Sequence, residues 1–190
     1  MSLNINQFKN SLLNGGVRPN LFRVNGNIGN TPAPSELGFL IRTAALPETT
    51  LGQIEVPFRG RKLKLPGSRE YAEWTVTIIA DGEFKIRNAF ERWVDDIYSA
   101  VGNVASDEHD LNGALFPTWG VDQLNRKGEP IKSYQFFYCF PSSVGQMELD
   151  AENEDLATFE VTLQYSYFLT NDGTDETTQL GVAPLPGDSQ

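Results

Sequence analysis

Hydrophobic and polar residues alternate with a period of two in several short stretches of the chain, which is typical of half-buried β-strands. The clearest example is residues 71–82, YAEWTVTIIADG, whose two faces are Trp74, Val76 and Ile78 on one side and Glu73, Thr75 and Thr77 on the other. A second strand near the C-terminus has the same pattern, with Phe159, Val161 and Leu163 opposed to Glu160, Thr162 and Gln164. Each strand should bury its apolar face in a core and leave its polar face exposed.

Shorter apolar runs predict further strands. They fall at residues 21–24, 37–47, 54–60, 61–65 and 134–140. Residues 144–169 are expected to form a hairpin with an acidic turn, while residues 106–129 are expected to be a long excursion of turns.

The hydrophobic period changes to about 3.6 between Asp81 and Gly102, which predicts the one long helix, with Asp81 as N-cap and Gly102 as stop signal. Its apolar stripe is Ile86, Phe90, Trp93, Val94, Ile97 and Val101. A short amphipathic helix is also expected near the N-terminus, with Ile5, Phe8, Leu12 and Leu13 on one face and Gly15 and Gly16 at its end.

Together these elements predict a mainly β protein: a two-sheet β-barrel or sandwich with one flanking amphipathic α-helix and a short N-terminal helix. One domain should span residues 1–170, followed by an acidic tail at 171–190 that is disordered in the free subunit. The predicted core consists of Trp74, Val76, Ile78, Phe90, Trp93, Phe159, Val161 and Leu163.

Charge is unevenly distributed in this chain of net charge −10. The stretch RGRKLKLPGSR, residues 59–69, holds five of the fifteen basic residues and no acid: Arg59, Arg61, Lys62, Lys64 and Arg69. From Ser133 to Gln190 there is no Lys or Arg, and ten acids. A protein that grips nucleic acid needs cations spread over its contact surface, so one basic loop is thin support for that function.

Candidate catalytic and metal-binding residues are few. His109 lies among Asp107, Glu108 and Asp110 without a second His or Cys nearby, so a solvated loop is the simpler interpretation. The single cysteine, Cys139, is flanked by aromatic residues and is expected to act as a small buried hydrophobe. Residues 150–155, DAENED, lack the Gly and the distal Glu of an EF-hand loop. We therefore expect no enzyme activity, no metal and no cofactor.

Targeting and membrane signals are also missing from the sequence pattern. The N-terminus lacks the apolar run of a signal peptide, and no stretch approaches the roughly 18 apolar residues of a membrane span. We expect a soluble protein assembled in the cytoplasm, without membrane binding.

Three sequence blocks carry a resemblance to a known family. They are RPNLFRV, then VPFRGRKLKLPGSREYAEWTVTI followed by the helical AFERW, and FPSSVGQMELDAENEDLATFEVTLQYSYF. These blocks resemble the tail tube proteins of contractile-tailed, T-even-like bacteriophages. The middle block is the most specific, and in order and spacing the blocks cover most of residues 8–168. The loop at 25–37, the segment 106–129 and the tail beyond Leu169 depart from the family pattern, so nothing is carried over there.

The resemblance implies a structural virion protein. In that family six copies close into a ring, and rings stack into a hollow tail tube inside a contractile sheath, through which DNA is ejected into the host. The type VI secretion tube protein shares this architecture. Partners would be the chain itself, the sheath, baseplate, tape-measure and tube-terminator proteins, and double-stranded DNA in transit.

Two surfaces acquire expected roles from this resemblance. Ring stacking is expected of the basic loop with Arg59, Arg61, Lys62, Lys64 and Arg69, through an anionic neighbour; an ordinary solvated hairpin is the alternative. The polar strand faces with Glu73, Thr75, Thr77, Glu160, Thr162 and Gln164 would line either the lumen or the exterior, which alternation alone does not decide.

Other classes of function stay open on the sequence. A single-stranded nucleic-acid-binding β-barrel could use the basic loop, and a small hydrolase of unrecognised type would need a measured turnover. The tube could also belong to a phage-derived contractile injection or secretion device.

Overall fold

A computed structural model describes Ile5 and residues 16–32, 34, 36–99, 102, 115–152 and 154–171. In chain order its elements are β1 (Phe22–Gly26), α2 (Leu37–Leu40), β2 (Ile41–Ala44), β3 (Thr49–Phe58), β4 (Arg61–Tyr71), β5 (Trp74–Ile79), α3 (Lys85–Ile97), β6 (Trp119–Leu124), β7 (Pro130–Phe137), β8 (Phe140–Val144), β9 (Thr158–Gln164) and β10 (Tyr167–Asn171).

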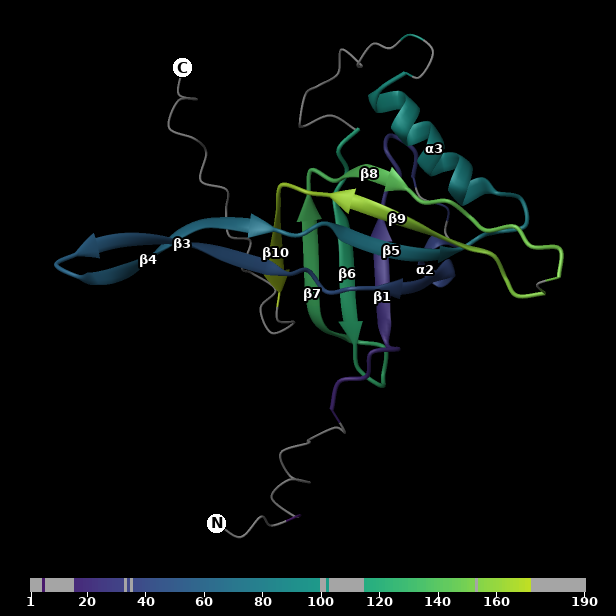
Figure 1. The fold of residues 1–190 in the computed structure, drawn as a ribbon. Coiled ribbons are helices and arrows are strands. Elements are labelled where there is room, and N and C mark those ends of the chain that lie inside the picture. Colours follow the sequence, from purple (N-terminus) through teal and green to yellow (C-terminus); the bar gives the residue numbers. More distant parts are fainter. Residues whose placement is uncertain are drawn as a thin grey trace, which may run out of the picture.

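Two four-stranded antiparallel sheets form the body of the molecule (Figure 1). One sheet has the strand order β1-β6-β7-β10 and the other has the order β2-β5-β9-β8. A separate two-stranded hairpin, β3-β4, extends away from them. The mainly β fold expected from the sequence is confirmed, as an open two-sheet sandwich without a closed barrel in the described part of the chain.

Aromatic side chains fill the space between the sheets. The Trp74 ring on β5 stacks on the Phe136 ring of β7, with centroids 4.5 Å apart, and meets the edge of the Trp119 ring on β6 at 6.1 Å. Helix α3 joins the same core through Phe90 and Trp93. All eight residues predicted for the core are buried. Alternation in the sequence therefore located the inner faces of β5 and β9 correctly.

Helix α3 is shorter than the hydrophobic stripe suggested, since it ends at Ile97. Phe84, in the left-handed region at φ 55°, occupies the N-cap position, but the Asp81 carboxylate accepts hydrogen bonds from the backbone N–H groups of Lys85 (2.8 Å) and Ile86 (3.2 Å). Asp81 therefore satisfies the first helical donors from outside the helix. Val101 lies outside the described residues.

The segment 106–129 was wrongly expected to contain only turns. Its second part holds β6, which lies between β1 and β7 in the first sheet, and Trp119 and Val121 on that strand are fully buried. The alternation was obscured because Gly120 and Asp122, residue types depleted in strands, occupy the other face.

Three expected strands also differ in their bounds. The run 37–47 begins with a single helical turn, α2, before β2 starts at Ile41. The run 134–140 breaks at Tyr138, whose φ is 58°, so that it contributes to both β7 and β8. Near the C-terminus, the chain leaves one sheet after Gln164 and enters the other at Tyr167, which divides the expected second hairpin arm into β9 and β10.

Two expectations cannot be compared with the structure. The predicted N-terminal helix falls on residues of which only Ile5 and Gly16 are described, and the tail beyond Asn171 lies outside the described residues.

Candidate assembly surfaces

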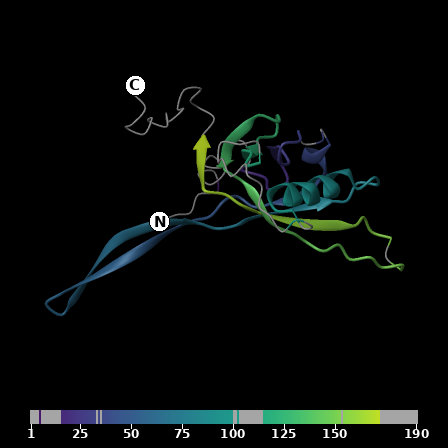
Figure 2. The same cartoon turned by 90° about the horizontal axis from the view of Figure 1, so that it is seen from above.

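The basic loop of the sequence is the turn and returning strand of the long hairpin β3-β4. Arg59 and Gly60 form the two-residue turn, with φ values of 44° and 82°, as a type I′ hairpin turn requires. The hairpin projects from the body as a narrow arm in both views (Figures 1 and 2). A bulge between Leu51 and Gln53 separates the root of the arm from its outer part.

Strand register divides the outer arm into two unlike faces. Pairing of Ile54 with Leu65 and of Val56 with Leu63 places these apolar residues on one side. We call this side, which consists of Ile54, Val56, Phe58, Leu63 and Leu65, the apolar hairpin face; all five residues are exposed.

The other face of the arm is charged. Glu55 lies directly opposite Lys64 and forms an ion pair with Lys62, with 2.7 Å between Nζ and Oε2. We call this side, with Glu55, Pro57, Lys62 and Lys64, the charged hairpin face. The five basic residues predicted to act together are thus not one patch, because two belong to this face while others lie at the turn and at the root.

The remaining cations sit at the two ends of the arm. Arg59 in the turn has its guanidinium carbon 5.5 Å from the centroid of the Phe58 ring, and Arg61 pairs with Phe58 across the strands. Arg69 pairs with Leu51 near the root. The tip therefore combines an exposed aromatic ring with two guanidinium groups.

The outer face of the β2-β5-β9-β8 sheet is rich in hydroxyl groups. Thr75 and Thr162 face each other across β5 and β9, with Oγ1 atoms 3.3 Å apart. Thr43 donates to Thr77 at 2.7 Å on the neighbouring strand pair. These contacts form a row of threonines on the side opposite to the core.

The acidic residues expected on this face lie at its two ends. Glu160 is exposed on β9 directly opposite Thr77. Glu73 precedes β5 and accepts a hydrogen bond from Gln164 Nε2 at 2.5 Å. The structure thus brings all six polar residues predicted for one surface onto the same side of this sheet.

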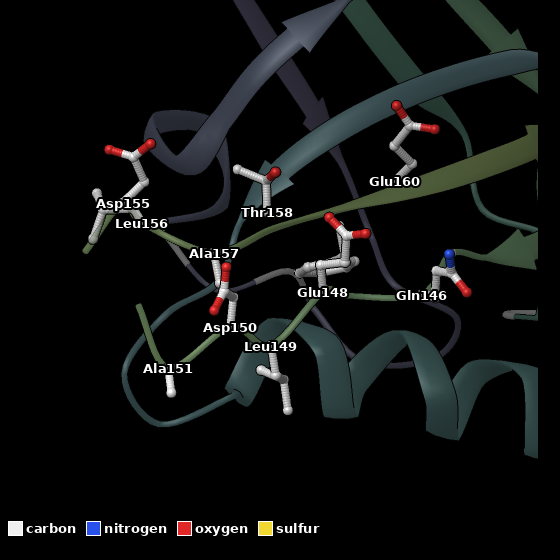
Figure 3. A pocket seen from close by; sticks show the side chains of 12 residues that line it. Gln146, Glu148, Leu149, Asp150, Ala151, Asp155, Leu156, Ala157, Thr158 and Glu160 are labelled. Carbon is white, nitrogen blue, oxygen red and sulfur yellow. The ribbon is translucent and has the colours of Figure 1, made fainter. Parts of the chain in front are cut away.

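An acidic loop connects β8 to β9 at the opposite end of the molecule from the hairpin (Figures 1 and 2). We call residues 145–152 and 154–157 of this connection the acidic loop. Its two arms enclose an open hollow of about 940 Å³, around which Figure 3 shows Glu148, Asp150 and Asp155. Leu149 and Leu156 are exposed on the same loop. No basic residue follows Lys132 in the sequence, so this loop contains no cation.

Cys139 is fully buried in the body of the molecule. Its Sγ lies 3.5 Å from the Phe136 carbonyl oxygen, to which it donates, and burial raises the pKa of the thiol from 9.0 to about 12. A thiol that stays protonated is a poor nucleophile. The structure is consistent with the packing role expected from the sequence.

Chemistry of other kinds has little support in the described residues. Among them, no three His, Cys, Asp or Glu side chains are placed to hold a metal ion. None of their helices has the length and apolar character needed to cross a membrane. His109 and its acidic neighbours lie outside the described residues.

Comparisons with known proteins agree with the geometry. Residues 4–171 match the model of the phage tail tube protein family. Tail tube protein gp19 of Enterobacteria phage T4 is 30% identical over 159 residues, which cover 80% of this chain and 90% of the relative.

Solved structures show the same fold. A chain in the PVC sheath-tube complex of an extracellular contractile injection system, in its extended state, aligns with a TM-score of 0.60 at 17% identity, over 90% of this chain and 99% of that one. A chain in the baseplate of the anti-feeding prophage aligns with a TM-score of 0.61 at 15% identity, over 80% of this chain and 93% of that one. The family match and the 30% identical relative confirm the sequence resemblance: the chain belongs to the phage tail tube protein family.

Proposed function

We propose that six copies of this chain close into a ring and that the rings stack into the hollow inner tube of a contractile phage tail, the conduit for DNA ejection. The observation that carries the proposal is the pair of unlike surfaces on one subunit. One sheet has a hydroxyl-rich outer face, and a long hairpin leaves the body with an exposed apolar side. Family membership supports the tube role.

The hydroxyl-rich face suits the wall of a channel for DNA. Duplex DNA carries about one charge per 1.7 Å, so a wall with many Lys and Arg would hold it by phosphate contacts. The four strands of this sheet contain a single basic residue, Arg42, at the bulge of β2. A wall of threonines with Glu160 offers DNA few attractive contacts and favours passage. We therefore assign Glu73, Thr75, Thr77, Glu160, Thr162 and Gln164 to the lumen.

The hairpin is assigned to ring stacking. It projects well beyond the body, and its Arg59, Arg61, Lys62, Lys64 and Arg69 belong to an otherwise anionic subunit. Further partners are expected to be the sheath, baseplate, tape-measure and tube-terminator proteins of the virion tail, after assembly in the host cytoplasm. Similar solved chains come from baseplate, sheath-tube and tube-terminator complexes. This function requires no catalysis, cofactor or membrane.

Nucleic-acid binding by the basic hairpin is less well supported. Lys62 is already paired with Glu55, and the apolar hairpin face offers one aromatic ring, Phe58, whereas single-strand binding uses several aromatic rings on which successive bases stack. Binding of single-stranded oligonucleotides by the subunit, weakened by salt, would favour that function instead.

Electron microscopy of the purified protein in negative stain tests the proposal. We expect hexameric rings or hollow tubes with a central channel, whose fraction increases with protein concentration in sedimentation velocity runs. A species that is monomeric at every concentration, in solution and on the grid, would contradict it.

A further inference from the structure

The apolar hairpin face has no cover within the described part of the subunit. Phe58 at its tip is 67% exposed, and the four aliphatic residues behind it are exposed as well. A contiguous apolar strip on a projecting arm is unusual for a soluble subunit and indicates a surface that is buried on association. A purely ionic contact between subunits would not require exposed apolar residues on the hairpin.

The acidic loop offers matching chemistry at the other end of the same subunit. Leu149 is 83% exposed and Leu156 is 74% exposed, on either side of the hollow lined by Glu148, Asp150 and Asp155. Apolar side chains ringed by carboxylates complement a tip in which Phe58 is flanked by Arg59 and Arg61.

The two surfaces cannot meet within one subunit, because they lie at opposite ends of it in both views (Figures 1 and 2). Two different patches at opposite ends of one chain make a head-to-tail contact, which extends a polymer with each added copy.

We propose that the hairpin tip of one copy docks on the acidic loop of a copy in the next ring, with Phe58 between Leu149 and Leu156 and with Arg59 and Arg61 against the carboxylates. The inference rests on the proposed function and names the partner surface of the stacking hairpin. The apolar contact supplies most of the affinity, since exposed ion pairs contribute little, while the charges set the orientation of the two copies.

Cysteine pairing tests the contact in assembled protein. Phe58→Cys subunits are co-assembled with Leu149→Cys or Leu156→Cys subunits and oxidised, and dimers are counted on a non-reducing gel. The native Cys139 is buried and does not interfere. We expect a dimer from the mixtures but from neither variant alone. Pro57→Cys, one residue away on the charged hairpin face, is the matched control and should give at least tenfold less dimer.

The outcomes separate the two proposals. Tubes that form without a dimer from either pair, or with as much dimer from Pro57→Cys, overturn this contact and leave the tube intact. Wild-type protein that forms neither rings nor tubes overturns the proposed function and this contact with it.

If the cysteine variants do not assemble, an exchange of charges between the two surfaces tests the contact instead. We expect Arg61→Glu to shorten tubes at least fivefold and Glu148→Arg in the same chain to restore most of the length, because the exchanged charges attract again. Tubes that stay short in the double variant, with circular dichroism like that of wild type, would overturn the contact.

Discussion

Trp119 leaves no room for a side chain at position 26. A Cβ atom on Gly26 would lie 2.4 Å from Trp119 Cδ2, well inside any real contact distance. Trp119 lies on the neighbouring strand β6, and its indole is completely buried. The ring therefore cannot move aside without disturbing the core.

Gly26→Ala is therefore expected to lower the free energy of unfolding by about 1–3 kcal/mol, as overpacked cores do. Gly82→Ala is the matched control, because a Cβ there meets no atom within 4 Å, and it should change stability by less than about 0.5 kcal/mol. Urea unfolding at neutral pH measures both. Equal stabilities of the two variants would contradict the assigned contact.

Cys139 gives the folded state a defined dependence on pH. Burial raises the pKa of its thiol to about 12 in the fold, against 9.0 without it, so the folded state holds this proton more tightly than the unfolded state does. The contribution of the protonated thiol to the free energy of unfolding is complete below pH 9. It is lost as the pH rises toward 12, at about 1.4 kcal/mol per pH unit.

Urea unfolding of wild type and of Cys139→Ala at several pH values between 7 and 10.5 measures this term. Wild type should lose stability more steeply than the variant above pH 9, while below pH 8.5 the two curves should run parallel. Burial raises the pKa of Tyr165, and the charges of Tyr71 and Cys139 raise it further, so the difference between the two curves reports the thiol together with its effect on Tyr165. Parallel curves over the whole range would argue against the burial of this thiol.

At the scale of elements, the hairpin has an apolar face and a charged face, which the sequence analysis treated as one basic loop. Its basic residues were visible as one run, and the register shows that Leu63 and Leu65 share one side of the hairpin with Val56 and Ile54. Charge reversal at Arg61 and Lys62 together would mix the two faces. Substitutions at neighbouring positions on opposite faces distinguish them.

Leu63→Thr and Lys64→Thr make such a pair. Both residues are exposed and Thr is a good strand former, so each variant should keep the hairpin and change stability by less than about 0.5 kcal/mol. We expect Leu63→Thr to slow tube elongation at least fivefold in light-scattering assays, and Lys64→Thr to change it by less than twofold. The apolar hairpin face has no part in stacking if the two variants elongate at the same rate.

The sequence was most informative for strands in which apolar and polar residues alternate without interruption. β5 and β9 alternate cleanly because one side faces the core and the other does not, so their core and polar residues were predicted correctly. β6 was missed, because Gly120 and Asp122 are tolerated there only through neighbours: Asn25 packs over Gly120, and Arg23 pairs with Asp122 at 2.8 Å.

The candidate surfaces, like the strands, could be predicted only in part from the alternation of apolar and polar residues. The polar face of β5 and β9 could be predicted from the period, while the apolar hairpin face as a whole could not, since it combines residues of two strands that are joined by pairing from Thr49–Tyr71 to the turn. The hollow in the acidic loop arises from how two arms of a loop separate, for which sequence carries no periodic signal.

At the scale of the whole molecule, one chain combines the surfaces that the proposed tube would use for its lumen and for ring stacking. The sandwich supplies a rigid body, the β2-β5-β9-β8 sheet presents a hydroxyl-rich face, and the two projecting segments lie at opposite ends (Figure 1). Because the ends differ, the proposed stacking would be directional, and a tube built in this way would have two distinct ends.

Glu160 provides a direct test of where the hydroxyl-rich face lies in the assembled tube. Its side chain is exposed on β9, opposite Thr77, and the neighbouring Phe159 and Val161 hold the strand in the core. Glu160→Lys should therefore leave folding and assembly intact. If the face lines the lumen, each ring of six gains six cations and loses six anions, and every ring adds phosphate contacts to the DNA in transit.

We expect phage particles carrying Glu160→Lys to eject DNA at least tenfold more slowly at low salt, and the delay to shrink as salt rises, because counterion release drives the phosphate contacts. Glu160→Gln, which removes the anion without adding a cation, should eject within about twofold of wild type. A fluorescent DNA-binding dye in the medium follows ejection in real time, and electron micrographs confirm normal tails. Ejection by Glu160→Lys particles at the wild-type rate in low salt would move this face to the outside of the tube.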